Sequence, residues 1–179
     1  VPEWTESRMA AEIEYEMCIL GATGKAFDTI VASGLRSALP HATPRRTLLG
    51  RNSPIVVDQG AILDGYTSDM TRMVCFGDPG RRFRELHGAV REAQAAATAS
   101  VKAGVKASTV DREARRVLRR FKLEKAFTHS TGHGLGLEIH ELPRVGPTEN
   151  TRLVSGMVIT IEPGAYIEDV GGVRIEDVV

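Results

Sequence analysis

The segment from Pro54 to Phe76 constrains the fold more strongly than any other part of this chain. β-Branched residues are frequent on both sides of Asp64-Gly65, a dipeptide that favours the two-residue turn of a β-hairpin. If that turn forms, Leu63 faces Tyr66, and counting outward gives every other pair because side chains alternate between the two faces of a strand. The segment is therefore predicted to be a hairpin of defined register.

Two acidic residues of this hairpin share one face. Counting outward pairs Asp58 with Thr71, and Asp69 lies two residues before Thr71, so both carboxylates project from the same side at a diagonal spacing. Beside the apolar residues 55–57, such carboxylates repel each other and are poorly solvated unless a proton or a cation compensates them. The alternative for this hairpin alone is a pair of solvated acids on its open face.

A second β pair is predicted from residues 157–167 and 173–179, linked through Gly171-Gly172. Glu162 and Glu176 each follow an apolar run in it, although a single glutamate at a strand end is usually a surface residue. The acids are 14 positions apart here and 11 in the first hairpin. Two similar halves facing each other would bring four carboxylates together beneath a layer of helices.

The Pro163-Gly164 pair directly after Glu162 is expected to bend the second β pair. Proline cannot donate to the ladder, so pairing should stop there and the glutamate side chain should be re-aimed.

Three of the five histidines lie between the two hairpins, within residues 128–143. Glycines flank His133, which lets its backbone approach other groups closely. A lone histidine is more often structural, but this cluster makes His133 the natural metal ligand. Oxygen-rich ligation with a single imidazole suits a pair of Mn²⁺, Co²⁺, Fe²⁺ or Zn²⁺ ions, and four carboxylates would balance their charge. Water bridging two such ions becomes a hydroxide near neutral pH.

Helical periodicity is predicted over three segments, residues 6–20, 82–102 and 108–121. Thr5 is suited to cap the first helix, and Ser108 with Asp111 three residues later resembles the capping box of the third. The expected buried stripes include Leu20 and Phe121. With a short β-type run over residues 27–32, the order is helix, strand, hairpin, two helices, loop and hairpin, which is typical of the α+β class.

Composition excludes several kinds of partner. The chain has 179 residues, of which 42% are hydrophobic, and 23 basic residues balance 23 acidic ones, so no basic field favours nucleic acid or an anionic membrane. No segment is apolar enough to span a bilayer. Cys18 and Cys75 are interpreted as buried hydrophobes, and a reducing, cytoplasmic location is expected. A GxxxxGKS loop and a GxSxG elbow are both missing, although a Ser-His-Asp triad is not excluded.

The sequence resembles the pita-bread metallopeptidases, which include prolidase, aminopeptidase P and methionine aminopeptidase. The similar segments are SALPHA (37–42), VVDQGAILDGYTSDMTR (56–72), HSTGHGLGLEIHELPR (129–144), GMVITIEPGAY (156–166) and GGVRIED (171–177). The GYTSDMTR form is closer to the Xaa-Pro branch than to methionine aminopeptidase. The resemblance implies a curved antiparallel sheet of two pseudo-symmetric halves, covered by helices.

The resemblance also implies a site for two divalent ions, Mn²⁺ or Co²⁺ before Zn²⁺ or Fe²⁺. The implied ligands are Asp58, Asp69, His133, Glu162 and Glu176, with Asp69 and Glu176 as bridging carboxylates. Glu162 is the implied general base that helps a metal-bridging water attack an Xaa-Pro bond.

Further residues of the motifs have implied roles in binding the substrate. His41, His129 and His140 match histidines that hold the scissile carbonyl and the oxyanion, and Arg144 matches a position associated with the substrate carboxylate. The alternative for Arg144 is an ordinary surface arginine.

Three residues are expected to support the ligands, namely Arg174, Tyr166 and Thr71. For Arg174 a simple cross-strand salt bridge is the alternative. His87 matches no motif and is left out of the site.

The implied protein is a peptidase whose substrate has proline at the second position, and which forms a homodimer at full length. This chain is expected to be the catalytic domain over residues 1–179, truncated at both ends and lacking an N-terminal domain. Whether dipeptides or longer peptides are cleaved stays open. Three alternative functions also stay open, namely a methionine aminopeptidase, a creatinase-like amidinohydrolase and a non-catalytic peptide-binding module.

Overall fold

The computed structural model describes residues 2–179. The three predicted helices occur in the predicted order, as α1 (Glu6–Ile19), α2 (Arg81–Ser100) and α3 (Ala107–Arg120). Two 3₁₀ turns that were not predicted, η1 (Gly34–Ala38) and η2 (Glu124–Ala126), accompany them. The strands of the first half are β1 (Gly24–Lys25), β2 (Ile30–Ser33), β3 (Pro54–Gln59), β4 (Ala61–Leu63), β5 (Tyr66–Thr67) and β6 (Met70–Cys75). Those of the second half are β7 (Gly132–Gly134), β8 (Glu141–Val145), β9 (Thr160–Ile161), β10 (Gly164–Ile167), β11 (Gly171–Arg174) and β12 (Asp177–Val178).

The hairpin around Asp64-Gly65 forms in the predicted register. Leu63 pairs with Tyr66 in β4 and β5, and Asp58 pairs with Thr71 in β3 and β6. Strand β2 pairs with the other edge of β3, so β3 lies in the middle of a three-stranded antiparallel sheet. The first carboxylate therefore projects from a central strand, where the backbone is held on both sides.

The second β pair is divided in two, as the Pro163-Gly164 pair predicts. β9 pairs with β12 before this bend and β10 pairs with β11 after it. The expected turn at Gly171-Gly172 is wrong, because the turn is formed by residues 168–170 and both glycines begin β11. A Cβ at Gly172 would lie 2.2 Å from the carbonyl oxygen of Ser37, so close packing of η1 explains this glycine.

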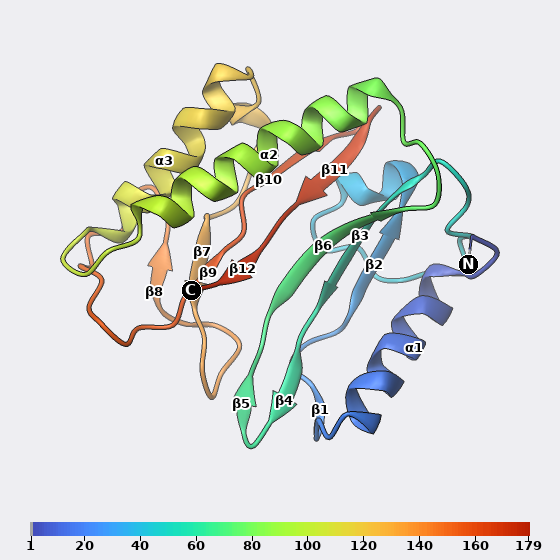
Figure 1. Ribbon diagram of the computed structural model, residues 1–179, viewed down its shortest axis with the longest axis horizontal. Helices are drawn as coiled ribbons and strands as arrows, with labels where there is room; N and C mark the ends of the chain where they lie inside the picture. Colours follow the sequence, from blue (N-terminus) through green and yellow to red (C-terminus); the bar gives the residue numbers. More distant parts are fainter. Residues whose placement is uncertain (1) are drawn as a thin grey trace.

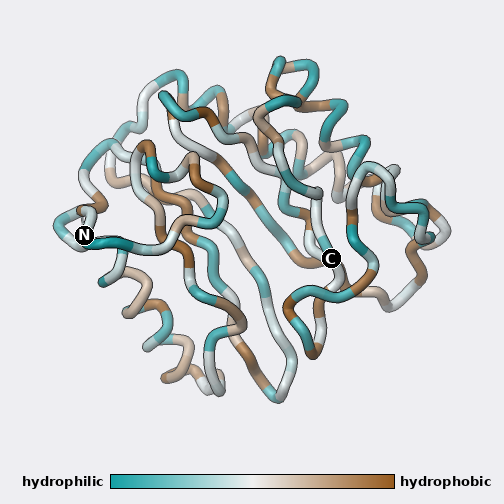
Figure 2. Tube along the Cα trace, turned by 180° about the vertical axis from the view of Figure 1, so that it is seen from behind, coloured by the Kyte–Doolittle hydropathy of each residue, from teal (hydrophilic) through white to brown (hydrophobic). Residues whose placement is uncertain are grey.

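The helices pack against separate halves of the strand layer (Figure 1). Helix α1 lies beside β2 and β3, where Ala10, Val31 and Ile55 form a small core. Helices α2 and α3 pack together and cover the second half through a larger core that includes Val90 and Val117. Figure 2 shows hydrophobic residues along the central strands and hydrophilic ones in many outer loops.

Two details of the helices differ from the sequence predictions. Thr5 caps α1 as expected, accepting from the Arg8 amide at 3.2 Å. In contrast, Ser108 lies inside α3 and caps nothing, because its amide and that of Ala107 donate to main-chain carbonyls of a neighbouring loop. Asp111 is thereby free for another contact.

Some residues expected to be buried are exposed. Leu20 and Phe121 follow the last residues of α1 and α3, where the chain turns away from the core, and they are 83% and 43% exposed. Cys18 is also exposed, because it lies on the outer face of α1, whereas Cys75 is half-buried. Within residues 2–179, each helix is too short or too polar to traverse a bilayer.

Candidate metal centre and substrate pocket

The two halves of the fold enclose a pocket of about 790 Å³. Most of the predicted site residues line it, namely His41, Asp58, Asp69, His129, His133, His140, Arg144, Glu162, Arg174 and Glu176. His87 lies on α2 and is not among the lining residues, in agreement with its omission.

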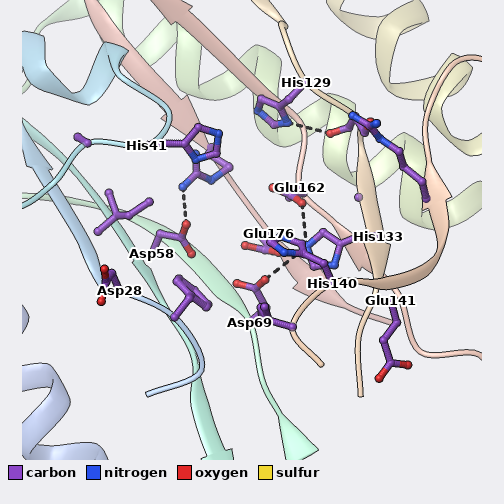
Figure 3. Close-up of a pocket in the computed structure, with 18 of the residues that line it drawn as sticks. Asp28, His41, Asp58, Asp69, His129, His133, His140, Glu141, Glu162 and Glu176 are labelled. Atoms are coloured by element: carbon purple, nitrogen blue, oxygen red, sulfur yellow. Dashed lines mark hydrogen bonds and ion pairs between the residues drawn. The ribbon is translucent and has the colours of Figure 1, made fainter. Parts of the chain in front are cut away.

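Four ligand candidates point toward one another at the floor of this pocket (Figure 3). His133 Nε2 lies 3.6 Å from Asp69 Oδ2 and 3.5 Å from Glu162 Oε1. One ligand atom each of Asp69, His133 and Glu176 lies within 4.8 Å of the others. Ligand atoms on opposite sides of a divalent ion are about 4 Å apart, since each bond is about 2 Å long. The spacing therefore suits a cation between them.

Glycines allow His133 to reach this position. A Cβ at Gly132 would lie 1.8 Å from the carbonyl oxygen of Thr160, and one at Gly134 would lie 2.5 Å from that of Leu142. Only residues without a side chain permit such close strand contacts on both sides of the imidazole. The His133 Nδ1 atom lies 2.9 Å from the Gly134 carbonyl oxygen, which fixes Nδ1 as the protonated nitrogen and directs Nε2 toward the carboxylates.

The fifth candidate, Asp58, is held by Arg174. Arg174 Nη2 donates to Asp58 Oδ2 at 2.5 Å, and both side chains are buried. Arg174 was expected to orient a ligand carboxylate. The carboxylate that it contacts is that of Asp58, a ligand candidate on β3, so the bond joins β11 to the first half of the fold. The other oxygen of Asp58, Oδ1, is buried without a hydrogen-bond partner in residues 2–179.

Thr71 connects the two halves at this point. Its hydroxyl donates to Glu176 Oε2 at 2.8 Å and accepts from Arg174 Nε at 3.0 Å. Glu176 Oε1, like Asp58 Oδ1, is buried and unpaired within the described chain. Buried polar atoms are rarely left without a partner, so these two oxygens indicate a missing ligand.

The cluster is short of positive charge. Burial raises the pKa of Glu162 to about 7, against the opposing effect of Arg174. Burial and the neighbouring Glu162 hold the pKa of Glu176 well above its usual value. Burial also raises the pKa of Asp58, although Arg174 opposes it. Burial lowers the pKa of His133, but Asp69 and Glu162 outweigh it and raise the pKa overall. Such a cluster is the kind of site that holds divalent cations.

Both ring nitrogens of His129 form hydrogen bonds with other residues of the protein. Its Nδ1 lies 2.8 Å from the Ser130 carbonyl oxygen, and its Nε2 accepts from the Tyr166 hydroxyl at 2.8 Å. Burial lowers the pKa of His129 to about 4, so the ring is neutral at physiological pH. Tyr166 in turn accepts from Arg174 Nη1 at 3.0 Å. Both ring nitrogens of His129 are hydrogen-bonded, so it supports Tyr166 in this structure while it also lines the pocket.

His41 lies in an exposed loop at the rim of the pocket. A buried glutamate of α1, Glu6, holds this loop by accepting from the amide of Arg45 at 3.0 Å and from Arg36 Nε at 3.1 Å. Arg36 Nη2 donates to the Thr43 carbonyl oxygen at 2.7 Å. The loop is therefore anchored on both sides of an imidazole that remains accessible.

His140 and Arg144 lie on the opposite rim. The His140 ring meets the edge of His133 with centroids 4.5 Å apart, and burial lowers its pKa. Arg144 on β8 is exposed, and its Nε donates to Ser130 Oγ at 2.6 Å. Neither terminal nitrogen of Arg144 has a hydrogen-bond partner within residues 2–179, so both are available to an anionic group.

The apolar wall of the pocket was not predicted from the sequence. It consists of Phe27, Ile30, Pro44, Ile139 and Leu142. The predicted strand over residues 27–32 begins only at Ile30, and this leaves Phe27 to line the cavity. These residues are ordinary hydrophobes in a linear pattern, so only their position in the fold distinguishes them from the core.

Comparison with known proteins agrees with this class of site. The model of metallopeptidase family M24 matches residues 1–179. The chain is 47% identical over 174 residues to the Xaa-Pro dipeptidase of Pyrococcus horikoshii. The aligned region covers 97% of this chain and 50% of that relative. The prolidase from Pyrococcus furiosus superposes with a TM-score of 0.98 at 46% identity, covering 100% of this chain and 53% of that one. The X-Pro aminopeptidase from Thermotoga maritima superposes with a TM-score of 0.97 at 44% identity, covering 100% of this chain and 51% of that one.

This chain therefore belongs to metallopeptidase family M24. The predicted pita-bread fold of the α+β class is confirmed by its structural similarity to these peptidases. The chain spans about half the length of the curated relatives that it matches.

Proposed function

We propose that the protein containing this chain hydrolyses peptide bonds in which proline is the second residue. The observation that supports this most strongly is the buried cluster of four carboxylates and one imidazole, with two unpaired oxygens, at the floor of an open pocket. The relatives named Xaa-Pro dipeptidase, prolidase and X-Pro aminopeptidase support the choice of bond.

The residues present fit two divalent ions. We assign Asp58, Asp69, His133, Glu162 and Glu176 as their ligands, with Mn²⁺ or Co²⁺ as the expected metal. Asp69 and Glu176 each place a carboxylate oxygen within 4.8 Å of the imidazole and of each other, which suits a bridging role. Ions in such a site supply Lewis acidity and lower the pKa of water toward neutrality.

The side chains around the cluster have separate roles in proton transfer, in binding the scissile carbonyl and in positioning the ligands. Glu162 takes a proton from the attacking water and passes it to the departing proline nitrogen. His140 and His41 face the pocket from opposite rims and donate hydrogen bonds to the scissile carbonyl oxygen as negative charge develops on it. Arg174 holds Asp58 in place, and Tyr166 with His129 holds Arg174.

A cleavage assay tests the proposed bond specificity. With Mn²⁺ or Co²⁺, the full-length protein is expected to hydrolyse Ala-Pro and a longer Xaa-Pro peptide but not Met-Ala. Release of methionine from Met-Ala without cleavage of Xaa-Pro bonds would indicate a methionine aminopeptidase. Cleavage of neither, together with no bound divalent ion under any loading condition, would indicate a non-catalytic peptide-binding module.

Arg144 is expected to favour substrates whose carboxylate follows the proline directly. An arginine fork that binds a carboxylate through charged hydrogen bonds contributes enough that Arg144→Met should lower kcat/KM on Ala-Pro about 10- to 100-fold. On Ala-Pro amide, which has no carboxylate, variant and wild type should be equal. An equal loss on both substrates would contradict carboxylate binding.

Metal binding is expected to release protons at mildly acidic pH. Because the pKa of Glu162 is about 7, its carboxyl is mostly protonated at lower pH and must ionise to bind a cation. Proton release should therefore grow as the pH is lowered from about 8 to 6. Titration calorimetry of Mn²⁺ in buffers of different ionisation enthalpy measures it.

The Glu162→Gln variant should release fewer protons than the wild type in that titration. Glu168→Gln changes an exposed residue in the turn between β10 and β11 and should leave the release unaltered. A binding heat that does not depend on the buffer at pH 6 would contradict the prediction.

A further inference from the structure

We propose that Asp111 and Arg115 of α3 are positioning residues for the segment 127–133, which carries two of the site histidines. This proposal rests on the proposed function in one respect, namely that the segment 127–133 takes part in catalysis. Neither residue lines the pocket, and neither belongs to a motif with a predicted role in function.

Arg115 binds the main chain of this segment through hydrogen bonds from its guanidinium group. Its Nη1 donates to the carbonyl oxygen of Phe127 at 3.2 Å, and its Nη2 donates to that of His129 at 2.7 Å. The guanidinium carbon also lies 4.3 Å from the centre of the Phe127 ring, whose edge-on contact with His129 has centroids 5.0 Å apart. One side chain therefore contacts the His129 residue through its carbonyl and through a shared aromatic neighbour.

Asp111 orients Arg115 and extends the same connection toward the metal cluster. It accepts from Arg115 Nε at 2.8 Å and from the hydroxyl of Thr131 at 2.9 Å. The carbonyl oxygen of Thr131 in turn accepts from the amide of Glu162 at 2.7 Å. Thr131 is fully buried, and it precedes the Gly132-His133 strand. The Asp111–Arg115 pair thus reaches both the His129 end and the His133 end of the segment.

This pair differs from the other ion pairs of the same helix. Arg116 and Glu113 are also close on α3, at 2.8 Å, but the arginine side chain is 54% exposed. Exposed pairs of this kind contribute little. The Asp111 side chain is 1% exposed, and its arginine directs donors onto carbonyls of a segment that has no strand partner until Gly132. A lysine cannot reproduce this planar arrangement, because its ammonium has no fixed fork of donors.

The test compares Arg115→Lys with Arg116→Lys in the full-length protein. In metal-free protein labelled with ¹⁵N-histidine, Arg115→Lys should shift the side-chain nitrogen signals of His129 and His133 but not those of His87. Because a displacement of 1 Å can lower the rate about 10²-fold, kcat on Ala-Pro in the metal-loaded protein should fall by about that factor with a smaller change in KM. Arg116→Lys should leave the signals and kcat unchanged.

Two results would overturn the inference. One is an Arg115→Lys variant with wild-type histidine signals and kcat. The other is a loss of activity that follows only the fraction of folded protein, with normal kcat per folded molecule. If Arg115→Lys does not fold, Thr131→Val takes its place, because it removes only the hydroxyl bond to Asp111, and the same shifts are then required. If the wild type cleaves no Xaa-Pro substrate, the proposed function fails while the NMR comparison still decides the positioning.

Discussion

Replacing Glu162 by glutamine is expected to lower kcat on Ala-Pro by about 10²- to 10⁴-fold, the range for loss of a general base. The pKa of about 7 that burial gives this carboxyl lets it exchange a proton near neutral pH. Glutamine has nearly the same shape and keeps an oxygen near His133, but it cannot take a proton from water. Steady-state assays of the full-length protein with saturating Mn²⁺ measure the effect.

Two observations separate this role from mere damage to the site. Glu168→Gln, in the exposed turn between β10 and β11, should keep wild-type kcat. Metal content of the Glu162→Gln protein should be measured directly, since this residue is also an assigned ligand. Undiminished turnover by metal-loaded Glu162→Gln would show that another group accepts the proton.

Replacing Arg174 by methionine is expected to destabilise the metal-free protein by about 3–5 kcal/mol, the usual cost of breaking a buried ion pair from one side. Methionine fills a similar volume but leaves the buried carboxylate of Asp58 without its only charged partner among the described residues. It also removes the donors to Thr71 and Tyr166. Denaturant unfolding of the full-length metal-free protein measures the change.

The destabilisation by Arg174→Met should depend on pH. Burial already raises the pKa of Asp58 in the wild type, and removing the guanidinium raises it further. When the pKa of a carboxyl is raised in the folded state, the free energy of unfolding of the protein falls as the pH rises through that pKa, because ionisation then favours the unfolded chain. The difference between variant and wild type should therefore shrink on acidification. A difference that stays constant from pH 4 to 8 would contradict this explanation.

Two further variants complete the test of the buried ion pair. Arg82→Met removes an exposed arginine paired with Asp169 at 3.2 Å, and it should cost no more than about 1 kcal/mol. Adding Asp58→Asn to Arg174→Met removes the unpaired charge and should restore part of the lost stability. If the double variant is no more stable than the single one, the unpaired charge is not the cause.

The histidines of the site show where prediction from motifs stops. His133 points at the carboxylates as the glycines on both sides of it suggested. His129 belongs to an equally recognisable motif, yet Tyr166 occupies one of its ring nitrogens. A motif specifies which residue is present, whereas the partners of a side chain depend on the strand that packs beside it. Tyr166 lies 37 positions further along the chain.

Asp111 illustrates the same limit within a helix. Its spacing from Ser108 is that of a capping box, but main-chain carbonyls from another loop satisfy the start of α3. The i,i+4 spacing to Arg115 was present in the sequence all along, although many such pairs are exposed and have no further role. Burial by the segment 127–131 separates this pair from the others, and burial is a property of the folded chain.

The sequence by itself determined the register of the first hairpin, the order of the three long helices and the break at Pro163-Gly164, whereas the segment predicted as a loop contains β7 and β8. These features depend on turn chemistry and on alternation along a strand, which act over a few residues. Tertiary structure alone decided that Arg174 pairs with Asp58, that Thr71 joins Glu176, and that an apolar wall faces the site. These contacts join segments more than a hundred residues apart, and they exist only because packing of the two halves brings distant strands into register.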